Sequence, residues 1–269
     1  MKYFLKEEGN FAGLPGAALA KAMPQADTVI FTSELTTPAG NTISVTKTLE
    51  LDEYEYKKKS LDSRSAIFMA NAAVLANTSD TFAGTARKAS KLSIVPGEPE
   101  KFADLNDLIK TLPLHKAMVN HTPKITTKAD SKRVSEEMRS VKVEAFLYAA
   151  SREDDNDFHL IIGRDPKEST KVFMTMEISG LPSQNAVPFD KKTFDTLKSA
   201  RDAYKDFFKN NLPGLGYDFY PDPIPITITG SLFFDMSHAT GSRPGPSKLR
   251  PFMPVVWEVH PVTEIKFKI

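Results

Sequence analysis

The stretch Val141-Lys-Val-Glu-Ala-Phe-Leu-Tyr148 has apolar residues at every odd-numbered position, and it opens the part of the chain that decides the fold. Alternation with a period of two is typical of a β-strand that buries one face in a core. Residues 158–162 and 172–178 repeat the alternation, with apolar residues at even-numbered positions. We therefore predict three consecutive strands, the first two joined by an acidic turn at residues 152–157.

A helix and two more strands follow. Asp190 is an expected N-cap, and apolar residues recur at helical spacing as far as Phe208, before Asn210-Asn-Leu-Pro-Gly214 ends the helix. Residues 224–234 and 257–269 return to the strand pattern. The order strand, strand, strand, helix, strand, strand is that of the five-stranded OB barrel. We predict an α+β protein with an OB-like barrel at its C-terminal end; another small barrel or an α+β sheet would show the same order.

The residues before this segment predict a mixed α+β part. Residues 28–36 and 42–51 read as a hairpin, and helical spacing occurs near residues 12–23, 62–77 and 102–112. The polar run at residues 122–140 interrupts the apolar pattern. We predict three parts, which are an N-terminal domain at 1–121, a polar linker at 122–140 and the barrel domain at 141–269.

The composition excludes several classes of protein. The chain has 269 residues, 41% hydrophobic residues, a formal net charge of +1 and no cysteine. A core of ordinary size can form, and the balanced charge argues against duplex DNA binding by charge alone. Without cysteine there are no disulfides, thiolate zinc sites or cysteine nucleophiles, so a metal would need His, Asp or Glu ligands. The charged start at residues 1–8 is unlike a signal peptide, and no apolar run is long enough to span a membrane, so we expect a cytoplasmic protein.

Strand parity directs several polar side chains away from the predicted core. Glu258 and His260 lie two residues apart on the outer side of the last strand, and the strand before it ends at Asp235, shortly before His238. Consecutive strands that pair would bring these side chains together at the base of the loop at residues 237–254, and His159 also faces outward. The candidate cluster is His159, Asp235, His238, Glu258 and His260.

Imidazoles and carboxylates in this combination suit a divalent metal ion, which can activate water. Without a metal, the same groups could act as a general acid and base, or could hold the long loop by buried hydrogen bonds. Spacing alone does not decide among these alternatives, since a specific signature such as H-E-x-x-H is absent.

Three segments, Asp157-Phe-His-Leu160, Thr229 to His238 and Trp257-Glu-Val-His-Pro-Val262, carry a resemblance. They are similar to a group of bacterial domains of unknown function that share D-x-H-L, a strand ending in D-x-x-H, and a closing E-[IL]-H-P signature. The resemblance covers residues 141–269 and implies that the five candidate residues belong to one pattern. It implies no activity. The Pro-rich and basic insertion at residues 241–251 departs from the compact form of the pattern.

A second candidate surface follows from the OB interpretation. OB folds stack bases on aromatic side chains of the outer barrel face, with basic residues on the phosphates. The expected binding face consists of Phe146, Tyr148, Phe173, Arg243, Lys248 and Arg250. Single-stranded nucleic acid or another small ligand would be the partner. The alternative is that the N-terminal part packs over this face and buries the aromatic side chains.

No phosphate-binding loop, dinucleotide-binding glycine motif or nucleophile elbow occurs in the sequence. We therefore predict a binding or accessory module that uses an OB-like barrel. The alternative is a metal-dependent hydrolase, acting on phosphoesters, that uses the His, Asp and Glu cluster with a divalent metal. Whether the protein is an enzyme stays open at this point.

Overall fold

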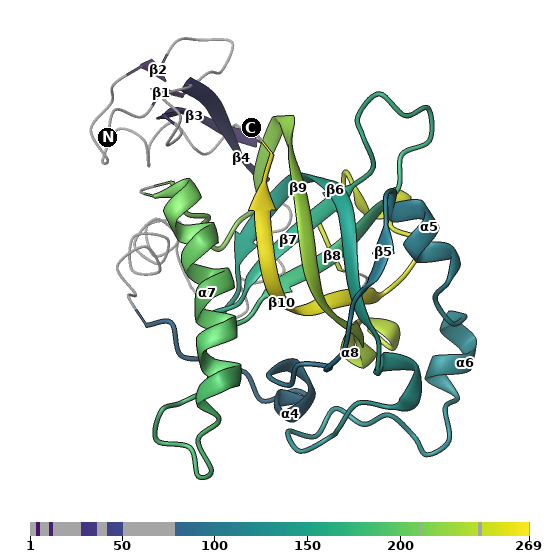
Figure 1. Cartoon of the computed structure of the whole chain (residues 1–269). Coiled ribbons are helices and arrows are strands. Elements are labelled where there is room, and N and C mark those ends of the chain that lie inside the picture. The colour runs from purple at the N-terminus through teal and green to yellow at the C-terminus, as the bar shows by residue number, and fades with distance from the viewer. Residues whose placement is uncertain are drawn as a thin grey trace.

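The computed structural model describes residues 79–209, 211–241 and 244–268, together with the backbone of four strands nearer the N-terminus (Figure 1). These four strands form one sheet in the order β2-β1-β3-β4. Their bounds are β1 Phe4–Leu5, β2 Phe11–Ala12, β3 Thr28–Thr36 and β4 Thr42–Glu50. The antiparallel pairing of β3 with β4 confirms the predicted hairpin. Apart from Ala12, the helices expected at 12–23 and 62–77 lie outside the described residues.

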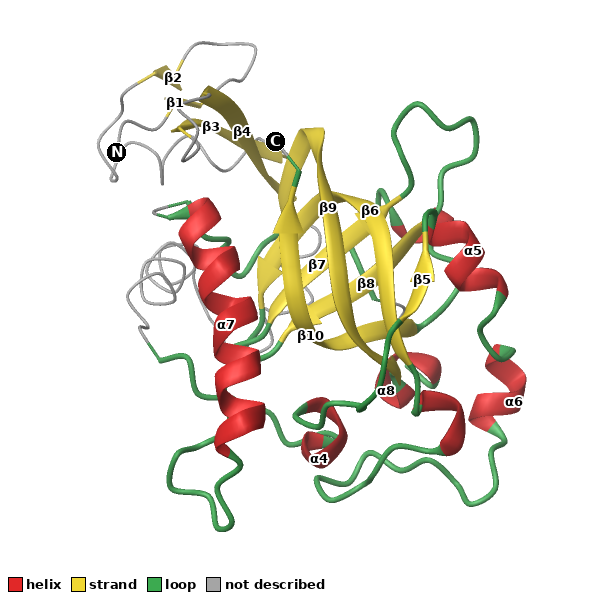
Figure 2. Ribbon diagram, viewed as in Figure 1, coloured by secondary structure: helices red, strands yellow, loops and turns green. Residues whose placement is uncertain are grey.

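A mixed sheet of six strands forms the centre of the structure, in the order β5-β6-β7-β8-β10-β9 (Figure 2). The strands are β5 Glu100–Phe102, β6 Ser140–Arg152, β7 Phe158–Gly163, β8 Phe173–Ile178, β9 Asp218–Phe234 and β10 Trp257–Phe267. Strand β9 pairs antiparallel with both β10 and β6, and β8 runs parallel to β10. Pairing therefore continues from β6 through β7, β8, β10 and β9 back to β6.

Helices lie around this sheet. They are α4 Lys88–Lys91, α5 Leu105–Lys110, α6 His115–Val119, α7 Lys191–Phe208 and α8 Met236–Ala239, with 3-10 turns at Ser135–Glu137 and Arg250–Phe252. Helix α7 lies against β10, as Figure 1 shows. The Asp190 side chain accepts a hydrogen bond from the Thr193 amide, which confirms the predicted N-cap.

All five predicted strands and the helix between the third and fourth are present, and the α+β class agrees with the structure. The predicted number of strands is wrong, because β5 adds a sixth strand parallel to β6. This short strand, Glu100-Lys-Phe102, has too few residues to show an alternating pattern. Its neighbour α5 falls within the helix predicted at 102–112.

The principal hydrophobic core takes side chains from both sides of the polar segment 122–140. Leu105, Leu108 and Met118 belong to the same buried cluster as Val141, Leu160 and other sheet residues. Within the segment, Arg133 donates hydrogen bonds to the carbonyl oxygens of Leu232 and His260. Residues 79–140 are thus packed against the six-stranded sheet, and the domain limits themselves stay a prediction. Among the described helices, none combines the length and the apolar character that a membrane crossing requires.

Candidate metal centre

Five polar side chains from β7, β8, β10 and the turn before β7 meet on the outer side of the sheet. We call them the buried centre: Asp157, His159, Glu177, Glu258 and His260. The relative exposure of their side chains does not exceed 7%. Alternate residues of the same strands, among them Leu160, Met176 and Val259, point the other way into the hydrophobic core. Strand parity therefore separates a polar face from an apolar one, as predicted.

Strand register places Glu177 in the middle of this group. Glu177 is the direct cross-strand partner of His159 in the antiparallel pair β7–β8. In the parallel pair β8–β10, Glu258 stands opposite Thr175, so the outward side chains of β10 approach those of β8. Directly opposite residues have Cβ atoms only about 4.5–5.5 Å apart. Both imidazoles therefore reach the same carboxyl group.

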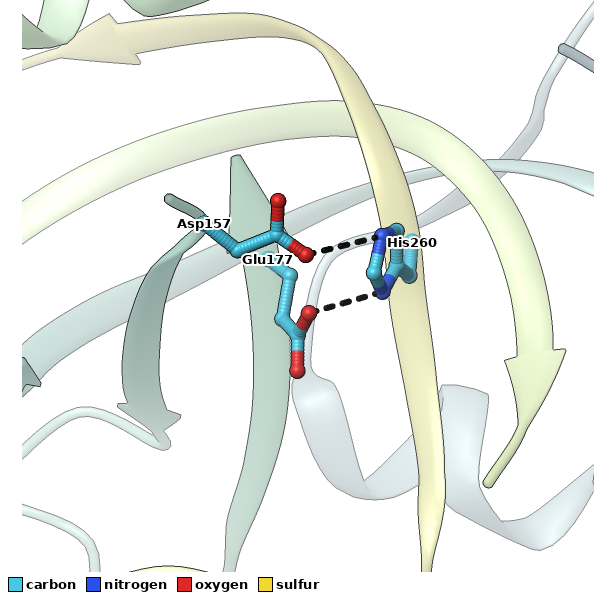
Figure 3. A group of neighbouring side chains, drawn as sticks. All are labelled: Asp157, Glu177 and His260. Carbon is cyan, nitrogen blue, oxygen red and sulfur yellow. Dashed lines mark ion pairs between the residues drawn. The ribbon is translucent and has the colours of Figure 1, made fainter. Parts of the chain in front are cut away.

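Two carboxyl groups, those of Asp157 and Glu177, face the two ring nitrogens of His260, as Figure 3 shows. Its Nδ1 is 2.9 Å from Glu177 Oε2 and 3.6 Å from Glu258 Oε2, while its Nε2 is 3.5 Å from Asp157 Oδ2. Neither ring nitrogen has a hydrogen bond of acceptable geometry within the described part of the chain. The ring therefore has carboxyl oxygens at ion-pair distance, and none of them in hydrogen-bond geometry among the described residues.

Two of these side chains are oriented by neighbours outside the group. The Gly180 amide donates to Asp157 Oδ1 at 2.6 Å, which leaves Oδ2 directed at His260. His159 Nδ1 lies 2.8 Å from the Tyr217 hydroxyl, while its Nε2 faces Glu177 Oε1 at 3.9 Å. A second hydrogen bond of this kind fixes the tautomer and the ring orientation in metal-binding histidines.

Glu258 is completely buried, and neither of its carboxyl oxygens has a hydrogen-bond partner among the described residues. A buried polar atom without a partner costs about 1–3 kcal/mol, and more when the group is charged. Burial, together with the nearby carboxyls of Glu177 and Asp235, raises the pKa of Glu258 well above its usual value. An ionised Glu258 therefore requires a positive charge, and no lysine or arginine among the described residues forms an ion pair with it.

Among the described residues, Lys91 of α4 is the lysine that forms ion pairs with the group. Its Nζ lies 3.4 Å from Asp155 Oδ2, 3.5 Å from Glu177 Oε2 and 3.9 Å from Asp157 Oδ2. Burial acts to lower the pKa of Lys91, but the carboxyls of Glu177, Asp157 and Asp155 outweigh it and raise that pKa well above its usual value. Lys91 therefore stays charged and compensates one side of the centre.

The pKa values of Glu177, Asp157 and His260 are shifted in different directions. Burial opposes ionisation of Glu177, but Lys91 and His260 hold its pKa well below the usual value. Burial raises the pKa of Asp157, and the carboxyls of Asp155 and Glu177 raise it further. Burial also lowers the pKa of His260 despite the carboxyl of Glu177. Burial thus favours the neutral ring of His260, which is the form that binds a metal.

Three of the five predicted cluster residues, His159, Glu258 and His260, belong to the buried centre. Asp235 lies close enough to affect Glu258, but its Oδ1 accepts hydrogen bonds from the Ser237 and His238 amides at the start of α8. His238 is partly exposed, with Nε2 3.6 Å from Asp235 Oδ2. The two residues therefore form a pair beside the centre.

Sequence reasoning missed Asp157, Glu177 and Lys91. Asp157 is part of the quoted D-x-H-L segment, and Glu177 has the outward parity on its strand, so both carried a signal. Lys91 carried none, because it comes from the part of the chain predicted to be a separate domain.

The expected aromatic binding face needs a correction. Phe173 is only 2% exposed, and it packs in a small apolar cluster with Met253 and contacts Phe252. Among the described residues, the loop between β9 and β10 covers Phe173; the alternative, cover by the N-terminal part, stays a prediction. Phe146 and Tyr148 are half-buried, and the Tyr148 hydroxyl donates to the Arg164 carbonyl oxygen.

The predicted basic residues have other contacts. Arg250 donates two hydrogen bonds to the Gly245 carbonyl oxygen, and the Lys248 ammonium lies 5.8 Å from the centroid of the Phe219 ring. Arg243 lies outside the described residues. An open stacking surface is therefore absent from the described part of this face.

No protein-family model matches the sequence, and a search of curated proteins finds no match. The resemblance to bacterial domains with a closing E-[IL]-H-P signature stays a prediction.

Proposed function

We propose that this chain is a metal-binding module built on an OB-like barrel, and that His159, Glu177 and Glu258 hold a divalent ion. Three features support the OB-like topology. Strand pairing returns from β9 to β6, β8 pairs parallel with β10, and α7 lies between β8 and β9 in the chain. In that topology, the ion would occupy the outer face of β7, β8 and β10.

The observation that carries the proposal is the state of Glu258. Both of its oxygens are buried without hydrogen-bond partners within the described residues, and one of them lies with His159 and Glu177 ligand atoms inside 4.8 Å. A bound cation would satisfy both oxygens. A protonated Glu258 would instead have an O–H group without an acceptor among the described residues. A buried polar group without a partner needs an explanation, and a bound ion is one that suits a histidine and two carboxylates.

The ligand chemistry selects the class of ion. One imidazole and two carboxylates, with no thiolate in the chain, favour ions such as zinc, manganese or iron over copper(I). The contact of His159 with Tyr217 prepares Nε2 for such an ion.

The burial of the centre favours a metal-binding role over a hydrolytic one. A hydrolytic metal keeps a coordination position open to water and substrate, but every side chain of the buried centre is at most 7% exposed. The hydrolase alternative would need the covering segments to open. The proposed ion therefore ties the barrel to the segments that cover it, in agreement with an accessory or binding role.

Metal content tests this proposal. Protein purified without chelator or histidine tag, and then incubated with zinc or manganese, should retain metal after gel filtration, as measured by elemental analysis. Glu258→Gln should lose the ion held by His159, Glu177 and Glu258, because the amide removes a ligand charge with little change in shape. Glu264→Gln is the matched control, since Glu264 lies on the same strand, is half-exposed and pairs with Lys266.

Retention of the same number of metal ions per chain by both variants as by the unmodified protein would exclude Glu258 as a ligand. An absence of metal in the unmodified protein under all these conditions would overturn the proposal and leave the centre as a structural network.

A further inference from the structure

Two candidate ligand sets overlap in the buried centre. The first set is His159, Glu177 and Glu258, and the second set is Asp157, Glu177 and His260; within each set the ligand atoms lie within 4.8 Å of one another. Glu177 is the member that both sets share. Its Oε1 faces His159 Nε2 at 3.9 Å, and its Oε2 faces His260 Nδ1 at 2.9 Å. Each carboxyl oxygen of Glu177 thus faces a different imidazole ring.

The second set also contains buried polar atoms without hydrogen-bond partners in the described structure. These are Asp157 Oδ2, Glu177 Oε2 and both ring nitrogens of His260. They belong to side chains from three different strands or turns, so local geometry does not explain their convergence. The unmet atoms of the second set are different from those of Glu258, and they point to a ligand of their own.

The balance of charge supports a second cation. The carboxyl groups of Asp155, Asp157, Glu177 and Glu258 interact with the ammonium group of Lys91, and Asp235 is a fifth carboxyl group, which interacts with Glu258. One divalent ion would leave the fully ionised group two charges negative. Two divalent ions would neutralise it.

We propose that the buried centre binds two divalent ions, the second one held by Asp157 and His260, with Glu177 as the carboxylate that bridges them. This inference rests on the proposed function, since it adds an ion to the same centre. Carboxylate bridges of this kind are a common way of holding two ions about 3.5–4 Å apart.

Lys91 makes the two positions unequal. Its ammonium lies 3.5 Å from Glu177 Oε2 and 3.9 Å from Asp157 Oδ2, both in the second set. Like charges repel strongly at such short separations in a partly dry environment. The second ion therefore binds more weakly than the first, and removal of the Lys91 charge strengthens the second step.

Manganese titration of the full chain tests this inference. Equilibrium dialysis should give two manganese ions per chain in two steps, and the electron paramagnetic resonance spectrum at two equivalents should show coupling between them. His260→Ala should retain one uncoupled ion, and Asp157→Asn should do the same if His260→Ala fails to fold. Lys91→Met should tighten the second step on the order of tenfold and leave the first nearly unchanged. His238→Ala, outside both sets, should keep two ions.

The outcomes separate the two proposals. One ion per chain with an uncoupled spectrum would overturn the second site and leave the first intact. Two ions without coupling would overturn the bridging role of Glu177, and two ions in both His260→Ala and Asp157→Asn would overturn the second set. No bound manganese or zinc would overturn this inference and the proposed function together. Far-UV circular dichroism identifies any variant that fails to fold.

Discussion

Arg87 and Glu137 form a buried ion pair that joins separate parts of the chain. The guanidinium of Arg87 donates to both carboxyl oxygens of Glu137, at 2.7 and 2.8 Å, and also to the Phe234 carbonyl oxygen. Glu137 accepts in turn from the backbone amides of Val134 and Phe234. Both side chains are at most 2% exposed. The pair therefore anchors residues 87 and 134–137 to the end of β9.

We expect Glu137→Gln to lower the free energy of unfolding by about 3–5 kcal/mol, because it leaves a buried guanidinium without its counter-charge. Arg87→Met should cost a similar amount. The double variant should cost clearly less than the sum, since no uncompensated charge remains. Urea unfolding measures all three, with Glu136→Gln as the neighbouring control expected within about 1 kcal/mol of the parent. Strict additivity of the two single changes would show that the residues act independently.

Asp80 links the described start of the chain to α7. Its carboxyl oxygens accept hydrogen bonds from Arg201 Nε and Lys205 Nζ, both at 2.8 Å. Partial burial works against ionisation, but these two cations outweigh it and hold the pKa of Asp80 below its ordinary 3.8. A carboxyl whose pKa is lower in the folded state stabilises the fold above its unfolded pKa. That stabilisation is lost as the pH falls through the folded value.

Asp80→Asn should therefore destabilise the protein by about 1–2 kcal/mol at pH 7, after allowance for solvent screening. The difference from the parent should begin to shrink as the pH falls through about 4 and should vanish below the folded pKa. Thermal unfolding between pH 3 and pH 7 measures it. Asp202→Asn, in an exposed pair with Lys198, is the control and should have little effect. A deficit that is constant across this range would mean that the Asp80 charge contributes nothing.

Among the elements, strand β10 carries Glu258 and His260, and its irregular pairing with β9 determines the position of His260. The register shifts between Val259 and Val262, next to Gly230 of β9. A Cβ atom at Gly230 would lie 2.5 Å from the Pro261 carbonyl oxygen and 2.6 Å from a methyl carbon of Val259. Only glycine allows this close approach without a shift of the backbone.

Gly230→Ala should force β9 and β10 apart at this point, with a loss of about 1–3 kcal/mol of stability. The His260 side chain should move with the strand, so the second metal-binding step should weaken more than the first. Denaturant unfolding and manganese titration of the same preparation measure the two effects. If Gly230→Ala had the stability and the manganese binding of the parent protein, the Pro261 carbonyl group would be able to move aside for the added methyl group.

At the scale of the whole molecule, the proposed ions connect segments that are distant in sequence. Residues 155–159, β8 and β10 meet at the centre, and Lys91 brings in α4. A ligand that binds only the folded state stabilises it, by about 2.7 kcal/mol at a hundredfold excess over its dissociation constant. Metal binding should therefore act on all of these segments at once.

We expect hydrogen exchange of the chelator-treated protein to slow on addition of zinc or manganese at residues 88–91, 155–159, 175–179 and 257–261. Helices α5 and α6, which contribute no side chain to either ligand set, serve as the internal control and should change little. The melting temperature should rise in parallel and return to its starting value with chelator. Uniform protection of the chain would point to general stabilisation, without a local role for the centre.

The alternating and helical patterns within residues 141–269 predicted five strands, one helix and the direction of the strand side chains. A period of two places alternate residues on opposite faces whatever the strand pairs with, so Glu258 and His260 could be assigned to the outer face in advance. The N-cap at Asp190 and the helical spacing after it are likewise local properties.

The pairing of strands in the tertiary structure determines which outward side chains meet. Glu177 joins His159 and His260 through the register of β7 with β8 and through the parallel pairing of β8 with β10. Lys91 and β5 come from residues before the polar segment, and the loop between β9 and β10 covers Phe173. These contacts depend on pairing between residues far apart in the chain, and no local pattern encodes that choice, because side-chain periodicity is the same for every partner strand.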